Sequence, residues 1–182
     1  MNNLKSLGVA CLLIGLILIL RMIPHPANFA PVTAVALFSG FFFGKKYSVA
    51  VPLLGMFLSD LFLGWYAVQI MLSVYGSFLL IALLGMILKK HKGMVNTISF
   101  SLASSILFFT ITNLSVWLFS GMYSKTVDGL ILCYTYAIPF FKNTLAGDLF
   151  YTAVIFGCYA FMVALKNSPV WKFKHQTVAK IS

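Results

Sequence analysis

Long apolar stretches separated by short polar ones run the whole length of the chain. A helix that crosses the hydrocarbon core of a bilayer needs about 20 mostly apolar residues, within a range of about 17–25. Six stretches meet or approach this length and predict membrane-spanning helices, at residues 4–23, 31–44, 47–63, 67–88, 94–119 and 144–165. The stretch at 31–44 is short for a full crossing, which little tilt or a locally thinned bilayer would accommodate.

The polar separators contain the residues that end helices. Proline cannot continue a helix and favours an extended conformation in the residue before it, so Pro24 and Pro26 end the first span and open a loop that runs to about Ala30. The longest connection, 120–143, holds an amphipathic piece at 129–141 that we expect to be an interfacial or re-entrant helix ending near Pro139. The predicted fold is therefore an all-α integral membrane protein with about six transmembrane helices and this outer helix between spans five and six.

Basic residues are distributed unequally over the separators. Cytoplasmic loops of membrane proteins carry an excess of Lys and Arg. With the N-terminus inside, the outer segments hold only Arg21, Lys125 and Lys142 of the thirteen basic residues. We therefore expect both termini in the cytoplasm, together with the basic tail 166–182. The ten basic residues expected inside are Lys5, Lys45, Lys46, Lys89, Lys90, Lys92, Lys166, Lys172, Lys174 and Lys180.

The composition is that of a chain dissolved in lipid. Hydrophobic residues make up 61% of the 182 residues and charged residues 9%, against about 25% charged residues in a typical soluble domain. The net charge of +10 does not indicate a nucleic-acid partner, because the basic residues lie in short clusters between apolar runs. We expect one transmembrane domain over 1–182 in the bacterial inner membrane. Its first helix is retained, since no small-residue cleavage site follows it.

With this orientation the three carboxylates, Asp60, Asp128 and Asp148, all fall on the outer half. Ionisable groups in a membrane are costly, so they usually face the protein interior and pair with or bind something. Two interpretations of Asp60 stay open: a contact to a ligand, or a structural ion pair with Arg21.

Other polar residues gather on the same half. Asp148 is expected in the first turns of the sixth span, where the helix dipole favours an anion, and Tyr151 shares its helical face. Asn143 lies just before this span. In the fifth span, Asn113 and Trp117 lie on one stripe, and a buried amide such as that of Asn113 must find hydrogen-bond partners.

The loop after the first span has a stiff frame, because prolines flank His25 and Asn28 follows. Such a loop could close over a ligand as a lid. No motif of a hydrolase or metalloprotease occurs, and the three cysteines show no metal-binding spacing. No catalytic residue, metal site, cofactor or enzymatic activity is therefore predicted.

Six short motifs carry a resemblance to a known family. They are RMIPHPANFAP from Arg21, ALFSG from Ala36, LSD from Leu58, FFTITNLSVW from Phe108, GLILCY from Gly129 and IPFFKNTLAGD from Ile138. Over roughly residues 20–160 the chain resembles a bacterial family of membrane proteins known only as a domain of unknown function. That family implies no activity.

The layout is also distantly similar to the S-components of energy-coupling-factor vitamin transporters. These are six-helix proteins with both termini inside, which bind a vitamin near the outer face under a lid between helices one and two. A solitary cobalamin-binding branch works without a dedicated ATPase module. The resemblance implies that His25 and Asn28 lie in the lid and Asp60 near the ligand; a corrinoid would be substrate, not cofactor. The first span lacks the Ala-xxx-Ala motif that contacts the coupling subunit, offering only Gly8 and Gly15.

The leading hypothesis is a membrane uptake protein that binds a small vitamin-like molecule in an outward-facing pocket. Its partners would be the lipid bilayer, the ligand, and a coupling module or another membrane subunit. A non-transporting subunit or assembly factor is the second hypothesis, and an intramembrane enzyme with an Asp60–Asp148 dyad is the third. The predicted ligand-binding residues are His25, Asn28, Asp60, Asn113, Trp117, Asn143, Asp148 and Tyr151.

Overall fold

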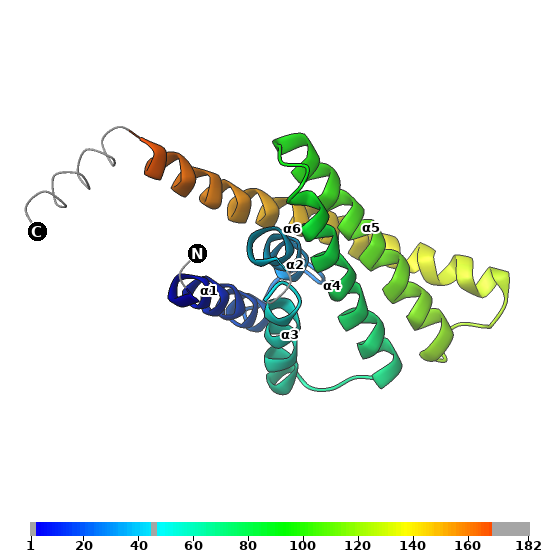
Figure 1. Ribbon diagram of the computed structural model, residues 1–182. Coiled ribbons are helices and arrows are strands. Elements are labelled where there is room, and N and C mark those ends of the chain that lie inside the picture. Colours follow the sequence, from blue (N-terminus) through cyan, green and yellow to red (C-terminus); the bar gives the residue numbers. More distant parts are fainter. Residues whose placement is uncertain (1–2, 45–46, 169–182) are drawn as a thin grey trace, which may run out of the picture.

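A computed structural model describes residues 3–44 and 47–168, and over these residues every regular element is a helix (Figure 1). Their bounds are α1 Asn3–Met22, α2 Val32–Phe43, α3 Ala50–Leu63, α4 Val68–Leu88, α5 Met94–Phe119 and α6 Val127–Asn167. The first five helices occupy the predicted spans, with ends shifted by a few residues at most. The all-α class predicted from the apolar stretches is confirmed.

The helices differ in their capacity to cross a bilayer. α1, α4, α5 and α6 are long and apolar enough to span it. α2 and α3 are as apolar but have only 12 and 14 residues. The chain is therefore a membrane protein with several helices of spanning length.

The prediction of a separate outer helix at 129–141 is wrong, because α6 is one helix of 41 residues that passes through Pro139. Buried positions follow one helical face on both sides of the proline, at Cys133, Ala137, Thr144 and Asp148. Pro139 removes one backbone hydrogen bond from the helix, which costs less than breaking this continuous packed face. Membrane helices tolerate prolines inside them. The N-terminal end of α6 is capped by Thr126, whose hydroxyl accepts a hydrogen bond from the amide of Gly129 at 3.2 Å.

The short helix α2 is the centre of the fold. Its residues from Val32 to Gly40 are all buried, and it contacts each of the other five helices. In Figure 1, α2 is seen nearly end-on and α3 runs downward from the centre, with α1 to one side, while α6 runs across most of the width of the view. α1 packs mainly on α3, and α5 packs between α4 and α6. The molecule therefore has an α1–α3 side and an α5–α6 side, joined through α2 and α4.

The crossing of α2 and α4 brings two helix backbones very close together. A Cβ atom added to Gly40 would lie 1.9 Å from the carbonyl oxygen of Ala82, and one added to Gly85 would lie 2.1 Å from that of Leu37. Small residues are preferred where membrane helices approach backbone to backbone, since lipid supplies no hydrophobic force between helices. The two glycines therefore set the distance between the two central helices.

Aromatic rings fill the contact between α2 and α6. Phe38 packs edge-on against Phe156 and Tyr159, with ring centroids 5.2 and 5.7 Å apart. Phe41 contacts the same two rings at 5.2 and 5.7 Å. This cluster fixes the second half of α6 to the C-terminal end of α2.

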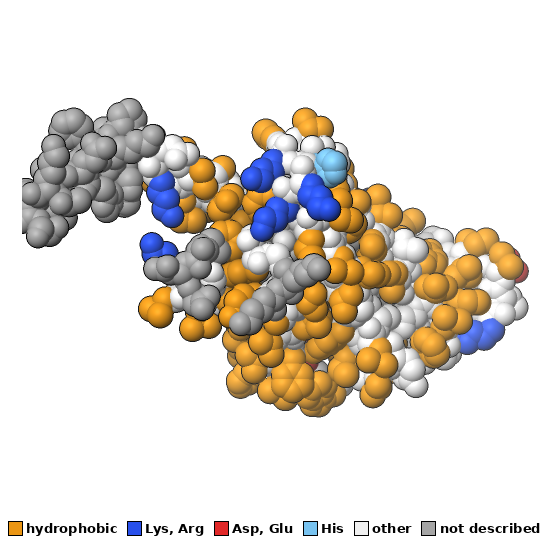
Figure 2. Space-filling view, in the orientation of Figure 1, with side chains coloured by type: hydrophobic (Ala, Val, Ile, Leu, Met, Phe, Trp, Pro, Cys, Tyr) orange, Lys and Arg blue, Asp and Glu red, His pale blue; other side chains and the backbone are white. Residues whose placement is uncertain are grey.

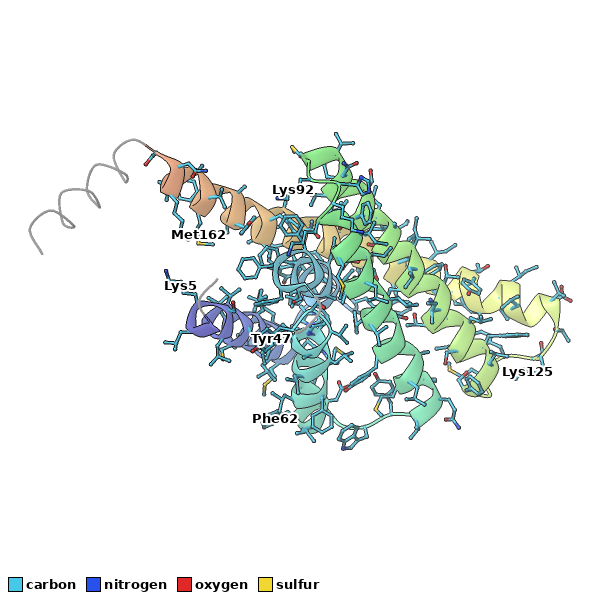
Figure 3. The ribbon with its side chains drawn as sticks, viewed as in Figure 1. Lys5, Tyr47, Phe62, Lys92, Lys125 and Met162 are labelled. Atoms are coloured by element: carbon cyan, nitrogen blue, oxygen red, sulfur yellow. The ribbon has the colours of Figure 1, made fainter. Side chains whose placement is uncertain are left out.

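Charge is distributed asymmetrically over the surface. In Figure 2, most of the blue Lys and Arg side chains gather on one side, over the α4–α5 connection and the neighbouring helix ends, and orange apolar side chains cover much of the remaining view. Figure 3 places Lys5 and Lys92 on this side, and Phe62 and Lys125 away from it. We call this side, with Lys5, Lys89, Lys90, Lys92 and Lys166, the basic end of the bundle.

Replacing Gly85 by alanine should destabilise the protein by about 1–3 kcal/mol, a typical cost of overpacking, because the new methyl group meets the backbone of α2. Gly76 is the matched control: it lies on the same helix, and a Cβ there meets nothing within 4 Å. Thermal unfolding in detergent should show a lowered midpoint for Gly85→Ala. Gly76→Ala should match or exceed the wild type, since alanine favours helix. Equal midpoints for the two variants would contradict this packing account.

Candidate functional site

Asp60 is the centre of a polar network that joins three helices. It lies in the last turn of α3 with 1% of its surface exposed. Arg21, at the end of α1, donates from Nη1 to Asp60 Oδ1 at 2.7 Å and forms a salt bridge with it. The hydroxyl of Tyr75 on α4 donates to the other carboxylate oxygen at 2.8 Å. Both oxygens of Asp60 are therefore engaged within the protein.

Neighbouring side chains make further contacts with Arg21 and Asp60. Arg21 Nη1 also contacts the Ser59 hydroxyl, and it approaches the sulfur of Met56 at 3.2 Å. In the α3–α4 loop, burial and then the nearby negative charge of Asp60 raise the pKa of Tyr66 to about 12. Of the two interpretations left open for Asp60, the geometry favours the structural ion pair with Arg21.

Asp148 is the centre of a different polar site, formed by α2, α5 and α6. It is 1% exposed, and the Ser105 hydroxyl of α5 lies 2.6 Å from its Oδ2. The Thr33 hydroxyl of α2 also lies near this carboxyl group. Within the described part of the chain, the Arg21–Asp60 pair is the only salt bridge, so Asp148 has no cationic partner there.

Hydroxyl groups continue this site along the α5–α6 contact. The Ser105 hydroxyl is also 3.1 Å from the backbone carbonyl oxygen of Ser101. The side-chain oxygen of Ser101 lies 3.1 Å from that of Thr152 on α6. All four side chains, Asp148, Ser105, Ser101 and Thr152, are buried. The α5–α6 contact therefore holds two polar pairs one helical turn apart, Ser105 with Asp148 and Ser101 with Thr152.

Thr152 also lines a cavity of about 720 Å³ between the start of α5 and the second half of α6. The α5 wall runs from Lys92 to Ile98, the α6 wall lies between Leu149 and Ala164, and Phe41 of α2 closes the inner side. The walls are largely apolar, with Lys92 as their one charged side chain. This basic-end groove is therefore largely apolar, has a cation on its lining and reaches the hydroxyl pair Ser101–Thr152.

Residues 1–171 of the chain match a protein family described as "Family of unknown function (DUF6580)". The chain belongs to the DUF6580 family. Comparisons of this DUF6580 protein with curated proteins and with solved structures found no match.

The loop between α1 and α2 of this DUF6580 protein is docked on α6. Phe29 packs against Tyr151 with ring centroids 5.5 Å apart, and its ring and Cα lie against Gly147. The Asn143 amide donates to the Ala27 carbonyl at 3.1 Å. Asn143 and Tyr151, both predicted to contact a ligand, thus hold this loop in place.

The two predicted lid residues of this loop are exposed. The Nδ1 atom of His25 bonds to the Pro26 carbonyl at 2.8 Å. Asn28 adopts a left-handed conformation with a φ of 65°, as asparagine tolerates in tight turns. No group of three or more His, Cys, Asp or Glu side chains that could hold a metal ion occurs in the described ranges 3–44 and 47–168.

Asn113 and Trp117 lie apart from both carboxylates, where α5 meets the first turns of α6. The Asn113 amide donates to the Phe109 carbonyl of its own helix at 2.8 Å. The indole N–H of Trp117 donates to the Ser124 carbonyl at 2.9 Å, and Lys125 lies over its ring. The side-chain N–H groups of these two residues therefore find acceptors within this corner of the bundle.

The predicted ligand-binding residues of the DUF6580 protein thus divide into separate groups. Asp60 lies among α1, α3 and α4, and Asp148 among α2, α5 and α6; in the chain as described, no hydrogen bond or ion pair joins them. The expected position of Asp148 in the first turns of a helix is wrong, because α6 begins at Val127 and Asp148 lies near its middle. The helix dipole therefore does not account for this carboxyl group.

Sequence reasoning found Arg21 as a partner of Asp60 but missed the other partners of the two carboxylates. Tyr75, Thr33 and Ser105 were not predicted, and neither was the groove. One signal was available: Ser101 and Ser105 are four residues apart in one helix and so share a face. Nothing in the sequence indicated that this face meets Asp148.

Replacing Arg21 by leucine should destabilise the protein by about 3 kcal/mol, because it leaves the buried carboxylate of Asp60 unpaired. Asp60→Asn in the same chain removes that unpaired charge, so the double variant should recover part of the loss. Unfolding midpoints in detergent for the two single variants and the double variant would measure the coupling. Strictly additive losses would show that the pair contributes no coupling energy.

Proposed function

We propose that this protein takes up a small vitamin-like molecule across the bacterial inner membrane, and that the basic-end groove is its binding site. The observation that carries the proposal is the groove itself: about 720 Å³, largely apolar, with a lysine on its wall. Sites for small molecules are typically concave, mostly apolar and about 300–1,000 Å³ in volume, with a few polar groups that orient the ligand.

The lining indicates the kind of ligand. Phe41, Phe156 and Tyr159 present aromatic surface that suits a planar ring system. Lys92 supplies a cation for an acidic group, and Thr97 and Thr152 supply hydroxyls. A ring-containing carboxylic acid or phosphate ester meets this pattern, whereas a corrinoid with its nucleotide loop is too bulky for the groove.

The proposal differs from the sequence-based hypothesis in the side from which the pocket is reached. At the end of the bundle opposite the groove, the Asp60 network joins α1, α3 and α4, and Phe29 closes the α1–α2 loop onto α6. The positive-inside rule assigns the basic end to the cytoplasm. We therefore interpret the conformation as open toward the cytoplasm and closed toward the outside.

This interpretation keeps the main elements of the S-component hypothesis as proposals: six spans with both termini in the cytoplasm, and a lid between the first two helices. α2 and α3, although short, would complete the six crossings. Opening the outer side would require the α1–α2 loop to leave α6. A coupling subunit or another membrane protein would then be the partner that drives the change.

Ligand retention tests the proposal. The wild-type protein and Ala160→Trp, which fills the groove from an exposed position of its α6 wall, would be purified in mild detergent, and small molecules that co-purify would be identified by mass spectrometry. The wild type should retain one ring-containing acid, and Ala160→Trp should lose it. Lys92→Ala should lower retention up to about tenfold, because Lys92 is exposed and its hydrogen bond to a charged group contributes less than the roughly 1.5–3 kcal/mol of a buried one.

Two variants serve as controls for the groove. Lys90→Ala removes a lysine from the same loop that does not line the groove, and Ala103→Trp adds a large ring to an exposed position of α5 outside it. Both should retain the ligand as the wild type does. If the wild type repeatedly yields no small molecule, or if Ala160→Trp retains the same one, the groove is not the binding site.

A further inference from the structure

Asp148 is the one buried carboxyl group of the described structure that has no cation beside it. Asp60, equally buried, is paired with Arg21, and Asp128 is exposed. Burying an isolated negative charge in a medium without water is far more costly than burying a neutral group. The site therefore favours an Asp148 that carries a proton.

The elements packed against Asp148 hold almost no charge that would change this balance. α2 and α5 contain no ionisable side chain at all. On α6, the nearest ionisable neighbours are Tyr151, which packs on Phe29, and Lys142, which is exposed. In the α1–α2 loop, His25 is exposed and bonds to a backbone carbonyl. The contacts to Asp148 come from the hydroxyls of Ser105 and Thr33.

The geometry around Ser105 provides a place for that proton. A serine hydroxyl has a single hydrogen to donate, yet the Ser105 oxygen lies near two acceptors, the Asp148 carboxyl at 2.6 Å and the Ser101 carbonyl at 3.1 Å. When Asp148 is protonated, its O–H donates to Ser105, and Ser105 donates to Ser101. When Asp148 is ionised, Ser105 turns its hydrogen to the carboxylate. Both states are hydrogen-bonded without any movement of the helices.

A metal cation fits the same site poorly. The distance of 2.6 Å between Ser105 and Asp148 is that of a direct hydrogen bond and leaves no space for an ion between the two oxygens. Cation sites in membrane proteins also use backbone carbonyls freed where helices unwind, whereas α5 and α6 are continuous on both sides of this contact. The oxygens available are therefore suited to a proton.

We propose that Asp148 is a proton-binding site and that its proton exchanges with the basic end of the bundle along the α5–α6 contact, past the hydroxyl pair Ser101–Thr152. This pair leads toward the groove, because Thr152 both bonds to Ser101 and lines the cavity. One proton from water binds the carboxylate and gives the neutral acid, and its release restores the carboxylate. Insofar as the proposed function holds, the proton is the ion whose binding is coupled to uptake.

Infrared spectroscopy tests the site directly, because the chain contains three aspartates and no glutamate. In a maltoside detergent, which has no ester carbonyl, the wild type at neutral pH should show the band of a protonated carboxyl group. Asp148→Asn should lose this band, and Asp128→Asn, which changes an exposed aspartate, should keep it. Absence of the band from the wild type, or its persistence in Asp148→Asn, would overturn the proposal.

Two further pairs of variants test the hydrogen-bonded partners. Ser105→Ala should shift the band to higher frequency because the carboxyl group loses its acceptor, whereas Ser104→Ala, which removes a hydroxyl bonded to its own helix, should not. After transfer to heavy water, Thr152→Val should slow the isotope shift of the band several-fold. Thr144→Val, in which the lost hydroxyl bonded to the Phe140 carbonyl, should exchange as the wild type does. Exchange at the wild-type rate in Thr152→Val would refute the path.

These measurements need no substrate, so they are independent of the proposed function. If the band is present and no ligand is retained, the uptake proposal fails and the proton site stands. If a ligand is retained and the band is absent, the proton site fails and the uptake proposal stands.

Discussion

The scarcity of hydrogen-bond partners in lipid is the constraint on which the rest of this structure depends. A polar group in the hydrocarbon core must be satisfied by the protein itself. Several buried hydroxyls here bond to a carbonyl one turn earlier in their own helix, as Ser104 and Thr144 do. The two buried carboxyl groups require partners from other helices, and those partners connect elements that are far apart in the sequence.

The two carboxyl groups meet this constraint in opposite ways. Asp60 is paired with the cation of Arg21 and accepts a hydrogen bond from the Tyr75 hydroxyl, and these contacts hold α1, α3 and α4 together. Asp148 is surrounded by hydroxyls alone, which solvate a neutral acid as well as an anion. The first arrangement suits a fixed contact, since removing either partner leaves a buried charge. The second suits a group whose charge changes during function.

The short helix α2 connects the two sites. Thr33, at its beginning, reaches Asp148, and Gly40, near its end, allows α4 to approach closely. α4 in turn carries Tyr75, the partner of Asp60. The aromatic cluster around Phe38 and Phe41 then forms the inner wall of the groove. A shift of α2 relative to α4 would therefore affect the groove and both carboxyl groups together.

The sequence by itself determined the lipid environment, the positions of the first five helices and the pairing expected for Arg21 and Asp60. The helix positions follow from the lengths of the apolar stretches and from the prolines and lysines that end them, which act locally. The pairing follows from the cost of burying charge, because the chain offers few charged residues as partners. The continuity of α6 through Pro139, the encounter of Asp148 with Ser105 and Thr33, and the groove were decided only by the tertiary structure. Whether a proline ends a helix depends on the face that packs on both sides of it. Which hydroxyls meet a carboxyl group depends on how helices cross, and that is set by close contacts such as Gly40 on Gly85.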